Sequence, residues 1–153
     1  MTINPFQFHT GLEYTPHGTN QLRGTCVFCG KEDHFYFDQS DFQWSCKSCQ
    51  RKGNLYSFLT QFHAQLLPDP VLILAEERGI PVKYFHESRI RYNQFLSNGT
   101  YLVFAIPTYN KDGALNNLYK VIPNPKKPGK RLILCTPSLS GTMFNQTKTS
   151  HQE

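Results

Sequence analysis

The sequence predicts an α+β fold, and three observations lead to this prediction. Two Cys-x-x-Cys pairs enclose short aromatic runs within residues 21–67, which predicts a metal-binding ribbon, a β-hairpin followed by a helix. Apolar residues at helical spacing between prolines predict a helical linker over 68–88. Apolar runs separated by turn residues predict a small antiparallel, β-rich part over 89–144. Of the two ends, 1–20 is polar and is expected to be an irregular arm, whereas 145–153 has no apolar residue to bury and is expected to be disordered.

The hairpin is predicted between the two cysteine pairs. Residues 34–37 (HFYF) and 42–45 (FQWS) are aromatic runs on either side of a polar tip at 38–41. Because side chains alternate along a strand, only some of the rings can face a small core. Rings on the outer face would be able to stack on unpaired bases, a contact that tolerates many sequences. The alternative is that all of them cover the cysteines and pack on the following helix.

Three helices are predicted after the second cysteine pair. Asn54 is a candidate N-cap for the first helix, whose apolar positions recur at helical spacing. These positions are Leu55, Phe58, Leu59, Phe62 and Leu66. The second helix has Asp69 as its candidate N-cap, Pro70 at its first position and Gly79 at its C-terminal end. A third, short helix is predicted over 81–87.

The β-rich part is predicted to contain three strands. The apolar run 101–106 ends at a proline, the turn residues 110–113 follow, and 115–122 returns as the second strand. The proline- and lysine-rich segment 124–130 is predicted to be a loop, and 131–135 a third short strand.

The charge balance favours an anionic partner without identifying one. The chain has a net charge of +5 and a pI of about 9.0, and the surplus of basic residues lies in 113–153. No run of roughly 18 apolar residues is present, so no membrane partner is predicted. The first residues lack the basic and apolar segments of a signal peptide, so we expect a cytoplasmic protein. Thiols stay reduced in that compartment, which makes the cysteines candidates for metal binding.

The four paired cysteines are predicted to bind one structural Zn²⁺ ion per chain. Sixteen residues separate the pair Cys26 and Cys29 from the pair Cys46 and Cys49, a spacing typical of four-cysteine zinc sites. Each pair forms a tight turn, or knuckle, and the hairpin brings the two knuckles together around a tetrahedral ion. Four thiolates fill every coordination position, so a zinc ion held in this way is structural and does not activate water.

Other uses of these cysteines are less favoured. Two disulfides would need an oxidising compartment, and a redox-active pair would be expected to open a helix within a βαβ pattern. His34 could replace one cysteine as a ligand, but four cysteines suffice and we expect His34 at the surface or in packing. Cys135 is alone in a predicted strand and is expected to be a small buried residue.

The sequences around the cysteines resemble a known family. CVFCGKEDHFYF and, further on, WSCKSCQRKGNLYSFL resemble the zinc-binding domain of bacterial and phage DNA primases in order, spacing and flanking residues. AEERGIPVKYFHESRIRY is similar to the helical linker after this domain, and YLVFAIPTYNKDGALNNLYKV to the strand–turn–strand that opens the RNA polymerase domain. RLILCTPSLSGTMFN resembles the segment before the Toprim subdomain. Val27 departs from the family, in which many relatives carry proline in the first knuckle.

The resemblance implies the N-terminal part of a DNA primase or primase–helicase, truncated before Toprim, which recognises single-stranded DNA template during replication in a bacterial or phage-infected cell. The chain is expected to lack catalytic residues, since the family's Toprim acids would lie beyond Phe144 and only Glu153 is acidic there. Primer synthesis would then need Mg²⁺ and a separate Toprim or helicase protein as partner. Alternatives are a stand-alone zinc-ribbon nucleic-acid-binding regulatory protein, and a protein-interaction module whose basic loop is merely solvated.

The candidate nucleic-acid contacts lie in the ribbon and in the basic loop. Those in the ribbon are Lys31, Lys47, Arg51 and Lys52 for phosphate and Trp44 for stacking. The resemblance adds Lys120, which falls where the family often has a basic residue lining the template groove. The loop before the last strand has the densest positive charge, and it contributes Lys126, Lys127, Lys130 and Arg131.

Overall fold

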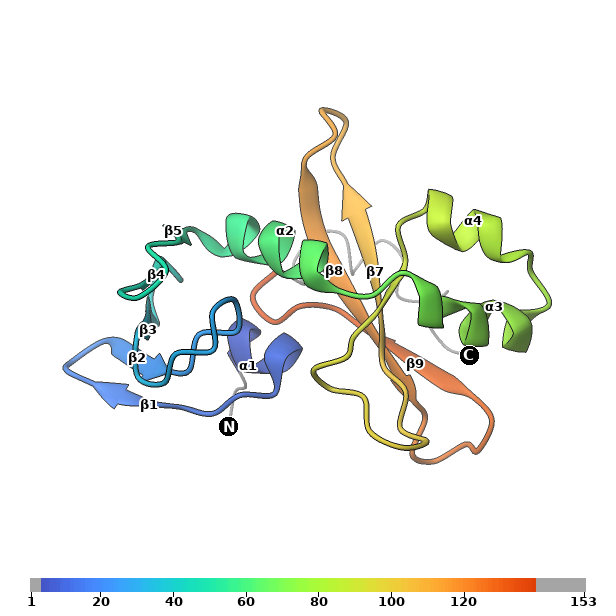
Figure 1. The fold of residues 1–153 in the computed structure, drawn as a ribbon, viewed down its shortest axis with the longest axis horizontal. Coiled ribbons are helices and arrows are strands. Elements are labelled where there is room, and N and C mark those ends of the chain that lie inside the picture. The colour runs from blue at the N-terminus through green and yellow to red at the C-terminus, as the bar shows by residue number, and fades with distance from the viewer. Residues whose placement is uncertain (1–3, 140–153) are drawn as a thin grey trace. The chain divides into compact units, whose positions relative to one another are not determined.

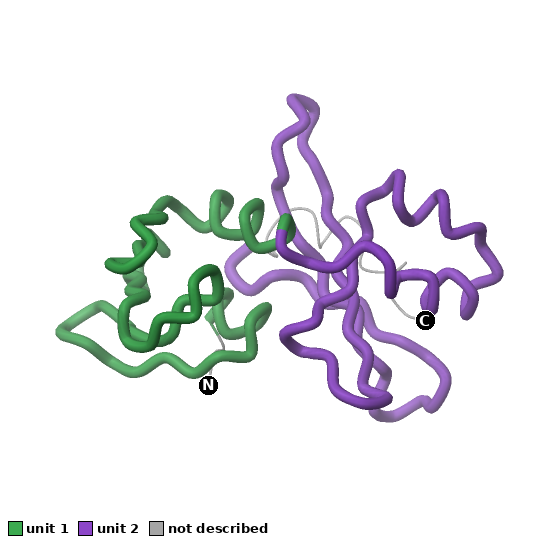
Figure 2. Tube along the Cα trace, viewed as in Figure 1, with its two compact units in different colours: residues 1–64 green, residues 65–153 purple. Residues whose placement is uncertain are grey.

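The computed structural model describes residues 4–139, so the predicted disordered tail at 145–153 lies outside the described residues. The chain divides into two compact units, unit 1 (Met1–Ala64) and unit 2 (Gln65–Glu153), shown in Figures 1 and 2. Each unit has its own antiparallel sheet together with short helices, which confirms the α+β class. Within the described residues, no helix is both long and apolar enough to cross a membrane.

Unit 1 is built on a five-stranded antiparallel sheet in the order β1-β2-β3-β4-β5. Its elements are α1 (Pro5–Thr10), β1 (Tyr14–His17), β2 (Gln21–Gly24), β3 (Phe35–Asp38), β4 (Trp44–Cys46), β5 (Lys52–Gly53) and α2 (Leu55–Gln65). The predicted hairpin is confirmed as β3 and β4, with Phe37 opposite Trp44 and Phe35 opposite Cys46. Strands β1, β2 and β5 extend the sheet beyond the hairpin that the sequence predicts.

The N-terminal segment is not an irregular arm, and the prediction for residues 1–20 is wrong over α1 and β1. The Asn4 side chain accepts a hydrogen bond from the Gln7 amide (2.7 Å), and Pro5 stands in the first turn of the helix. Gly11 ends α1 at a positive φ of 73°. Phe6 is fully buried, and its burial stabilises this short helix although the segment is polar in composition.

Aromatic rings fill the core of unit 1. The ring of Phe6 lies 4.1 Å from that of Phe37 and 4.6 Å from that of Phe58, centroid to centroid. Phe58 is stacked on Phe62, one turn along α2. The predicted cap of α2 is confirmed, since the amide of Ser57 donates to the Asn54 side chain at 2.9 Å. The core of unit 1 is therefore a cluster of rings between α1, α2 and the hairpin.

Unit 2 contains a four-stranded antiparallel sheet in the order β6-β7-β8-β9. Its elements are η1 (Asp69–Val71), α3 (Leu72–Arg78), α4 (Val82–Glu87), β6 (Arg91–Tyr92), β7 (Phe104–Tyr109), β8 (Leu115–Pro123) and β9 (Arg131–Leu134). Figure 1 shows β7 and β8 as a long hairpin. The buried cluster that joins the helices to this sheet consists of Val71, Leu74, Ala75, Phe85, Phe104 and Val121.

Several boundaries in unit 2 differ from the sequence predictions. A 3-10 turn precedes the second predicted helix, and no side chain caps that turn, so Asp69 is not its cap. The first predicted strand begins at Phe104 and continues through Pro107, where the prediction ends it. Pro107 is tolerated because β6 is only two residues long and pairs β7 at Phe104 and Ala105, so no partner needs the missing N–H. The predicted strand 131–135 ends at Leu134.

Candidate metal centre

The first cysteine knuckle follows β2. Its turn is closed by two backbone hydrogen bonds: the Gly30 amide donates to the Cys26 carbonyl (2.8 Å), and the Cys26 amide donates to the Lys31 carbonyl (3.1 Å). Gly30 has a φ of 79°, a left-handed conformation that glycine adopts without steric cost. This turn places the sulfurs of Cys26 and Cys29 on the same side of the chain.

The second knuckle, at the end of β4, repeats the same pattern. The Gln50 amide donates to the Cys46 carbonyl (3.0 Å), and the Cys46 amide donates to the Arg51 carbonyl (2.8 Å). Gln50 occupies the position equivalent to the glycine of the first knuckle and has a φ of 70°. The amides of Ser48 and Cys49 point at the Cys46 sulfur, at 3.3 and 3.4 Å. Such N–H···S contacts stabilise a thiolate and therefore favour metal binding.

The four sulfurs form a compact group. All four Sγ atoms lie within 4.8 Å of one another, with 3.9 Å between Cys26 and Cys49 and 3.7 Å between Cys29 and Cys46. A tetrahedral ion with Zn–S bonds of about 2.3 Å requires sulfurs about 3.8 Å apart. Disulfide bonds would bring two sulfurs to about 2.05 Å. The donor set and its spacing therefore fit a metal ion such as zinc, held by all four predicted ligands.

The protonation of the thiols follows their surroundings. Burial raises the pKa of Cys26 well above its ordinary value, and burial also raises the pKa of Cys49. The backbone amide of Lys31 lowers the pKa of the exposed Cys29 to about 7. A metal ion must displace the proton of every thiol that it ligates, so metal affinity is expected to fall as the pH is lowered.

The other two candidate ligands do not belong to this group. The Nδ1 atom of His34 lies 2.7 Å from the Glu32 carbonyl oxygen, and His34 is absent from the cysteine cluster. Cys135 belongs to unit 2, where the Asn117 side chain donates to its sulfur at 3.2 Å. Cys135 is half-buried, so it is less enclosed than the sequence predicts.

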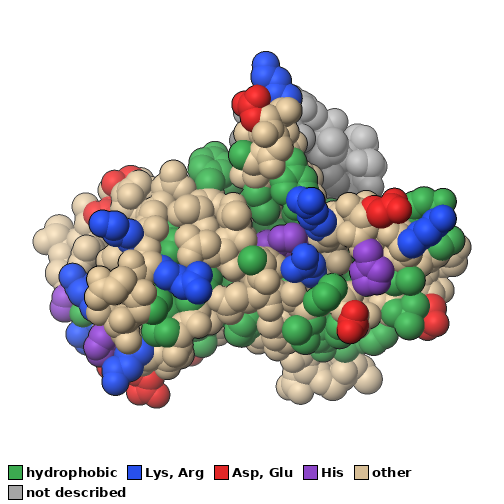
Figure 3. All heavy atoms as spheres, turned by 45° about the horizontal axis from the view of Figure 1, so that its top comes forward, with side chains coloured by type: hydrophobic (Ala, Val, Ile, Leu, Met, Phe, Trp, Pro, Cys, Tyr) green, Lys and Arg blue, Asp and Glu red, His purple; other side chains and the backbone are tan. Residues whose placement is uncertain are grey.

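Most of the predicted nucleic-acid contacts are exposed. The exposed side chains are those of Lys31, Lys47, Arg51, Lys52, Lys126, Lys127 and Lys130. Figure 3 shows Lys and Arg side chains spread over the visible face of unit 1. Lys120 lies half-buried on β8, and burial lowers its pKa to about 8.

Trp44 is not available to stack on a base, and its prediction as a nucleic-acid contact is wrong. Its side chain is 3% exposed and stacks on the ring of Phe35, with the centroids 5.6 Å apart. The indole nitrogen donates to the Asn54 carbonyl at 2.7 Å. Alternation along β4 places Trp44 on the core face opposite Phe37, so burial satisfies both its apolar body and its one donor.

Arg131 is likewise not available to bind phosphate. Its guanidinium donates to both carboxylate oxygens of Glu77, at 2.9 Å each, and to the Leu102 carbonyl at 2.8 Å. The side chain is 9% exposed and lies over the ring of Phe104, 5.1 Å from its centroid. The dense positive charge of the loop led to this prediction, but the partner carboxylate is far away in the sequence.

Arg23, Tyr36 and Ser45, which are not among the predicted contacts, lie on the outer face of the unit 1 sheet. The strand register places Arg23, Tyr36, Ser45 and Lys52 side by side on four neighbouring strands. Residues paired in this way project on the same face of a sheet. The nitrogen of Lys47 lies 5.5 Å from the Tyr36 ring centroid. A depression of 220 Å³ on the sheet is lined by Gln21, Tyr36, Gln43, Trp44 and Ser45 and by the acidic residues Asp38 and Asp41.

The alternation of aromatic residues in the sequence could have identified Tyr36 as a residue of the outer face, whereas no sequence pattern identified Arg23. Tyr36 lies between the buried residues Phe35 and Phe37, so period-two alternation assigns it to the outer face. Arg23 belongs to β2, a strand that the sequence does not predict.

No family model matches this sequence, and a search of curated proteins found no match.

Proposed function

We propose that this chain is the template-recognition part of a DNA primase or primase–helicase, and that unit 1 binds single-stranded DNA around a structural zinc ion. The observation that carries the proposal is the row Arg23, Tyr36, Ser45 and Lys52 on the outer face of the sheet that the cysteine centre holds. The family resemblance of the sequence supports the assignment to primases. Priming itself would need Mg²⁺ and a partner with Toprim acids.

The row combines two kinds of contact that suit a single strand. Tyr36 offers a half-exposed ring on which an unpaired base can stack, a contact worth about 1–3 kcal/mol. Lys47 is exposed next to this ring and Lys52 is exposed two strands further along the row, so both can neutralise phosphates of a bound strand. Arg51 is held differently, since it lies over the Phe28 ring at 5.0 Å and donates to Gln61 at 3.0 Å. In this proposal the zinc ion only holds the strands in register.

Binding of a labelled oligonucleotide tests the proposal. Wild-type protein should prefer a single strand to a duplex, and Tyr36→Ala should lower single-strand affinity about tenfold or more. Lys47→Ala and Lys52→Ala should each reduce the slope of log affinity against log salt by about 0.7. Lys111→Ala, an exposed lysine in a turn of unit 2, serves as the matched control. Equal single-strand affinity of Tyr36→Ala, Lys52→Ala and the wild type at low salt would refute the assignment.

A stand-alone regulatory nucleic-acid-binding protein is the alternative, and the lack of a family match keeps it open. Mixing the chain with a Toprim protein, template, Mg²⁺ and nucleoside triphosphates separates the two. Primer synthesis that requires the four cysteines supports the primase assignment. Single-strand binding without any stimulated synthesis supports the regulatory alternative.

A further inference from the structure

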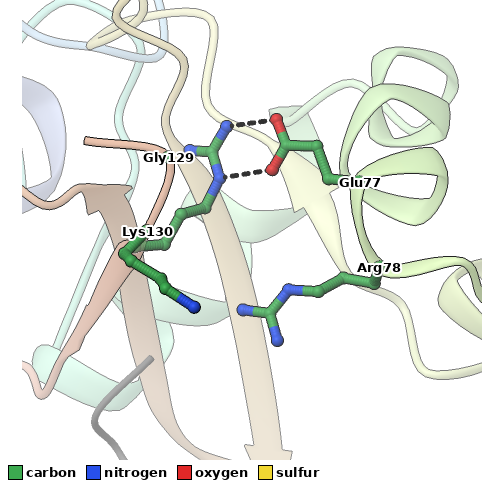
Figure 4. Close-up of a pocket in the computed structure, with 5 residues that line it drawn as sticks. Glu77, Arg78, Gly129 and Lys130 are labelled. Atoms are coloured by element: carbon green, nitrogen blue, oxygen red, sulfur yellow. Dashed lines mark hydrogen bonds and ion pairs between the residues drawn. The ribbon is translucent and has the colours of Figure 1, made fainter. Parts of the chain in front are cut away.

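Unit 2 contains a polar pocket apart from the residues of the proposed DNA-binding face. It has a volume of 190 Å³ and is lined by Glu77, Arg78, Gly129, Lys130 and Arg131 (Figure 4). The C-terminal end of α3 supplies the first two residues, and the loop that leads into β9 supplies the others. Of these five described residues, three are cationic and one is acidic.

One wall of the pocket is an ion pair between Arg131 and Glu77. Arg131 uses its Nε and both terminal nitrogens for the Glu77 carboxylate and the Leu102 carbonyl, all within 2.9 Å. Because each Glu77 oxygen already accepts a hydrogen bond from Arg131, this carboxylate is committed to that partner. The charge of Arg78 also helps to lower the pKa of Glu77, so this carboxylate acts on Arg78 as well.

The two remaining cations converge on the space beside this pair. Figure 4 shows the side chains of Arg78 and Lys130 extending from opposite sides, with their charged ends directed toward one another. The loop holds Lys130 in place, since its amide donates to the Lys127 carbonyl (3.0 Å) and its carbonyl accepts from the Asn124 amide (2.9 Å). An anion in the space between these two cationic ends would accept hydrogen bonds from both.

The lining also indicates the class of anion. Arginine and lysine together are the usual ligands of phosphate, the first through a planar fork and the second as a point charge. Among the residues that the structure describes, no aromatic or aliphatic side chain lines the pocket, so these residues offer nothing on which a base could stack. The volume accommodates one or a few phosphate groups rather than a whole nucleotide.

We infer that this pocket is a phosphate-binding site, with Arg78 and Lys130 as direct ligands and the Arg131–Glu77 pair as its fixed wall. The phosphate comes from a nucleoside polyphosphate or from the 5′ end of a nucleic acid. This site is independent of the single-strand face on unit 1.

Calorimetric titration of the full chain with inorganic tripolyphosphate tests the inference. We expect saturable binding of one tripolyphosphate per chain. Arg78→Gln and Lys130→Gln should each weaken binding about tenfold or more, because each removes a charge-assisted hydrogen bond. Lys126→Gln and Lys127→Gln are matched controls, since both residues belong to the same loop, lose the same charge and do not line the pocket. They should change affinity by about twofold or less.

Competition identifies the source of the phosphate. Displacement of tripolyphosphate by a nucleoside triphosphate, or by an oligonucleotide with a 5′-triphosphate, supports the site and names its ligand. Three outcomes overturn it: no saturable binding at millimolar tripolyphosphate, an equal loss in the loop controls, or equal displacement by a 5′-hydroxyl oligonucleotide. The last two would show a diffuse attraction of the basic loop for any anion. Circular dichroism of each variant checks that the exposed substitutions leave the fold intact.

Discussion

Unit 1 gathers phenylalanine rings around one point and adds a four-sulfur centre, whereas unit 2 covers one sheet with mostly aliphatic side chains and adds an ion pair. A module of about 60 residues buries too little surface to be more than marginally stable, and unit 1 (Met1–Ala64) is near this size limit. In unit 1 a metal ion bound by the four cysteines would add stability. Without a cation, the four thiolates repel one another. The two units should therefore respond to different perturbations.

Loss of the metal is expected to have the largest effect, and only in unit 1. Cys46→Ser should lose the metal and, with it, binding free energy on the order of 10 kcal/mol that is coupled to folding. Trp44 is the only tryptophan in the chain and is buried in unit 1, so its emission reports this unit alone. Its emission should shift to the red, while amide protons of β7 and β8 in unit 2 stay protected from exchange.

Cys135→Ser is the matched control for this experiment, because Cys135 is outside the cluster and should leave one zinc bound per chain. A metal-free chain in which Trp44 stays shielded would contradict the comparison. It would show that the rings around Phe6 are sufficient to hold unit 1.

Removal of the ion pair is expected to have an intermediate effect, and only in unit 2. Arg131→Ala removes three charge-assisted hydrogen bonds, and because the Glu77 side chain is 43% exposed we expect a loss of only about 1–3 kcal/mol. Faster amide exchange in β9 with unchanged Trp44 emission would measure this loss. Lys127→Ala, an exposed residue of the same loop, should change neither signal.

The same pair gives unit 2 a pH dependence of defined sign. Hydrogen bonds from Arg131 hold the pKa of Glu77 below its ordinary value. A depressed folded-state pKa stabilises the fold above the unfolded-state value of about 4.3, and this contribution is lost as the pH falls through the folded-state pKa. Glu77→Gln should therefore flatten the stability of unit 2 against pH below about pH 4. An unchanged acid profile in Glu77→Gln would show that the pair contributes nothing to stability.

The sequence predicted the parts of each unit whose signals are local. The cysteine spacing, the hairpin and the Asn54 cap each depend on residues close together in the chain, and the structure has all three. Helix α1 was missed although Asn4, Pro5 and Gly11 are local signals, because its fully buried ring, Phe6, packs on partners distant in the sequence.

The candidate site divides in the same way. The ligand cysteines follow from spacing alone, whereas the burial of Trp44 and Arg131 depends on which strand face and which distant carboxylate each one meets. Residue type and local charge density identified both as contacts, but only tertiary packing determines whether a ring or a guanidinium is left exposed.

The smallest expected effect lies within the metal centre and compares its two knuckles. Gly30 and Gln50 occupy equivalent positions with φ values of 79° and 70°, so the second knuckle holds a side chain in a conformation that costs about 1 kcal/mol. Gln50→Gly should stabilise metal-loaded unit 1 by about 0.5–1 kcal/mol in denaturant unfolding followed by Trp44 emission. Gly30→Gln should destabilise it by a similar amount.

The space around Gly30 makes the reciprocal change a clean test. A Cβ atom built on Gly30 meets nothing within 4 Å, so any cost of Gly30→Gln arises from the backbone conformation and not from a clash. The double variant with both changes should then return to nearly wild-type stability, since one strained side chain replaces the other. A cost of Gly30→Gln several times the gain of Gln50→Gly would break this equivalence. It would mean that the first knuckle needs glycine for a reason other than φ, such as access of a ligand to the exposed sulfur of Cys29.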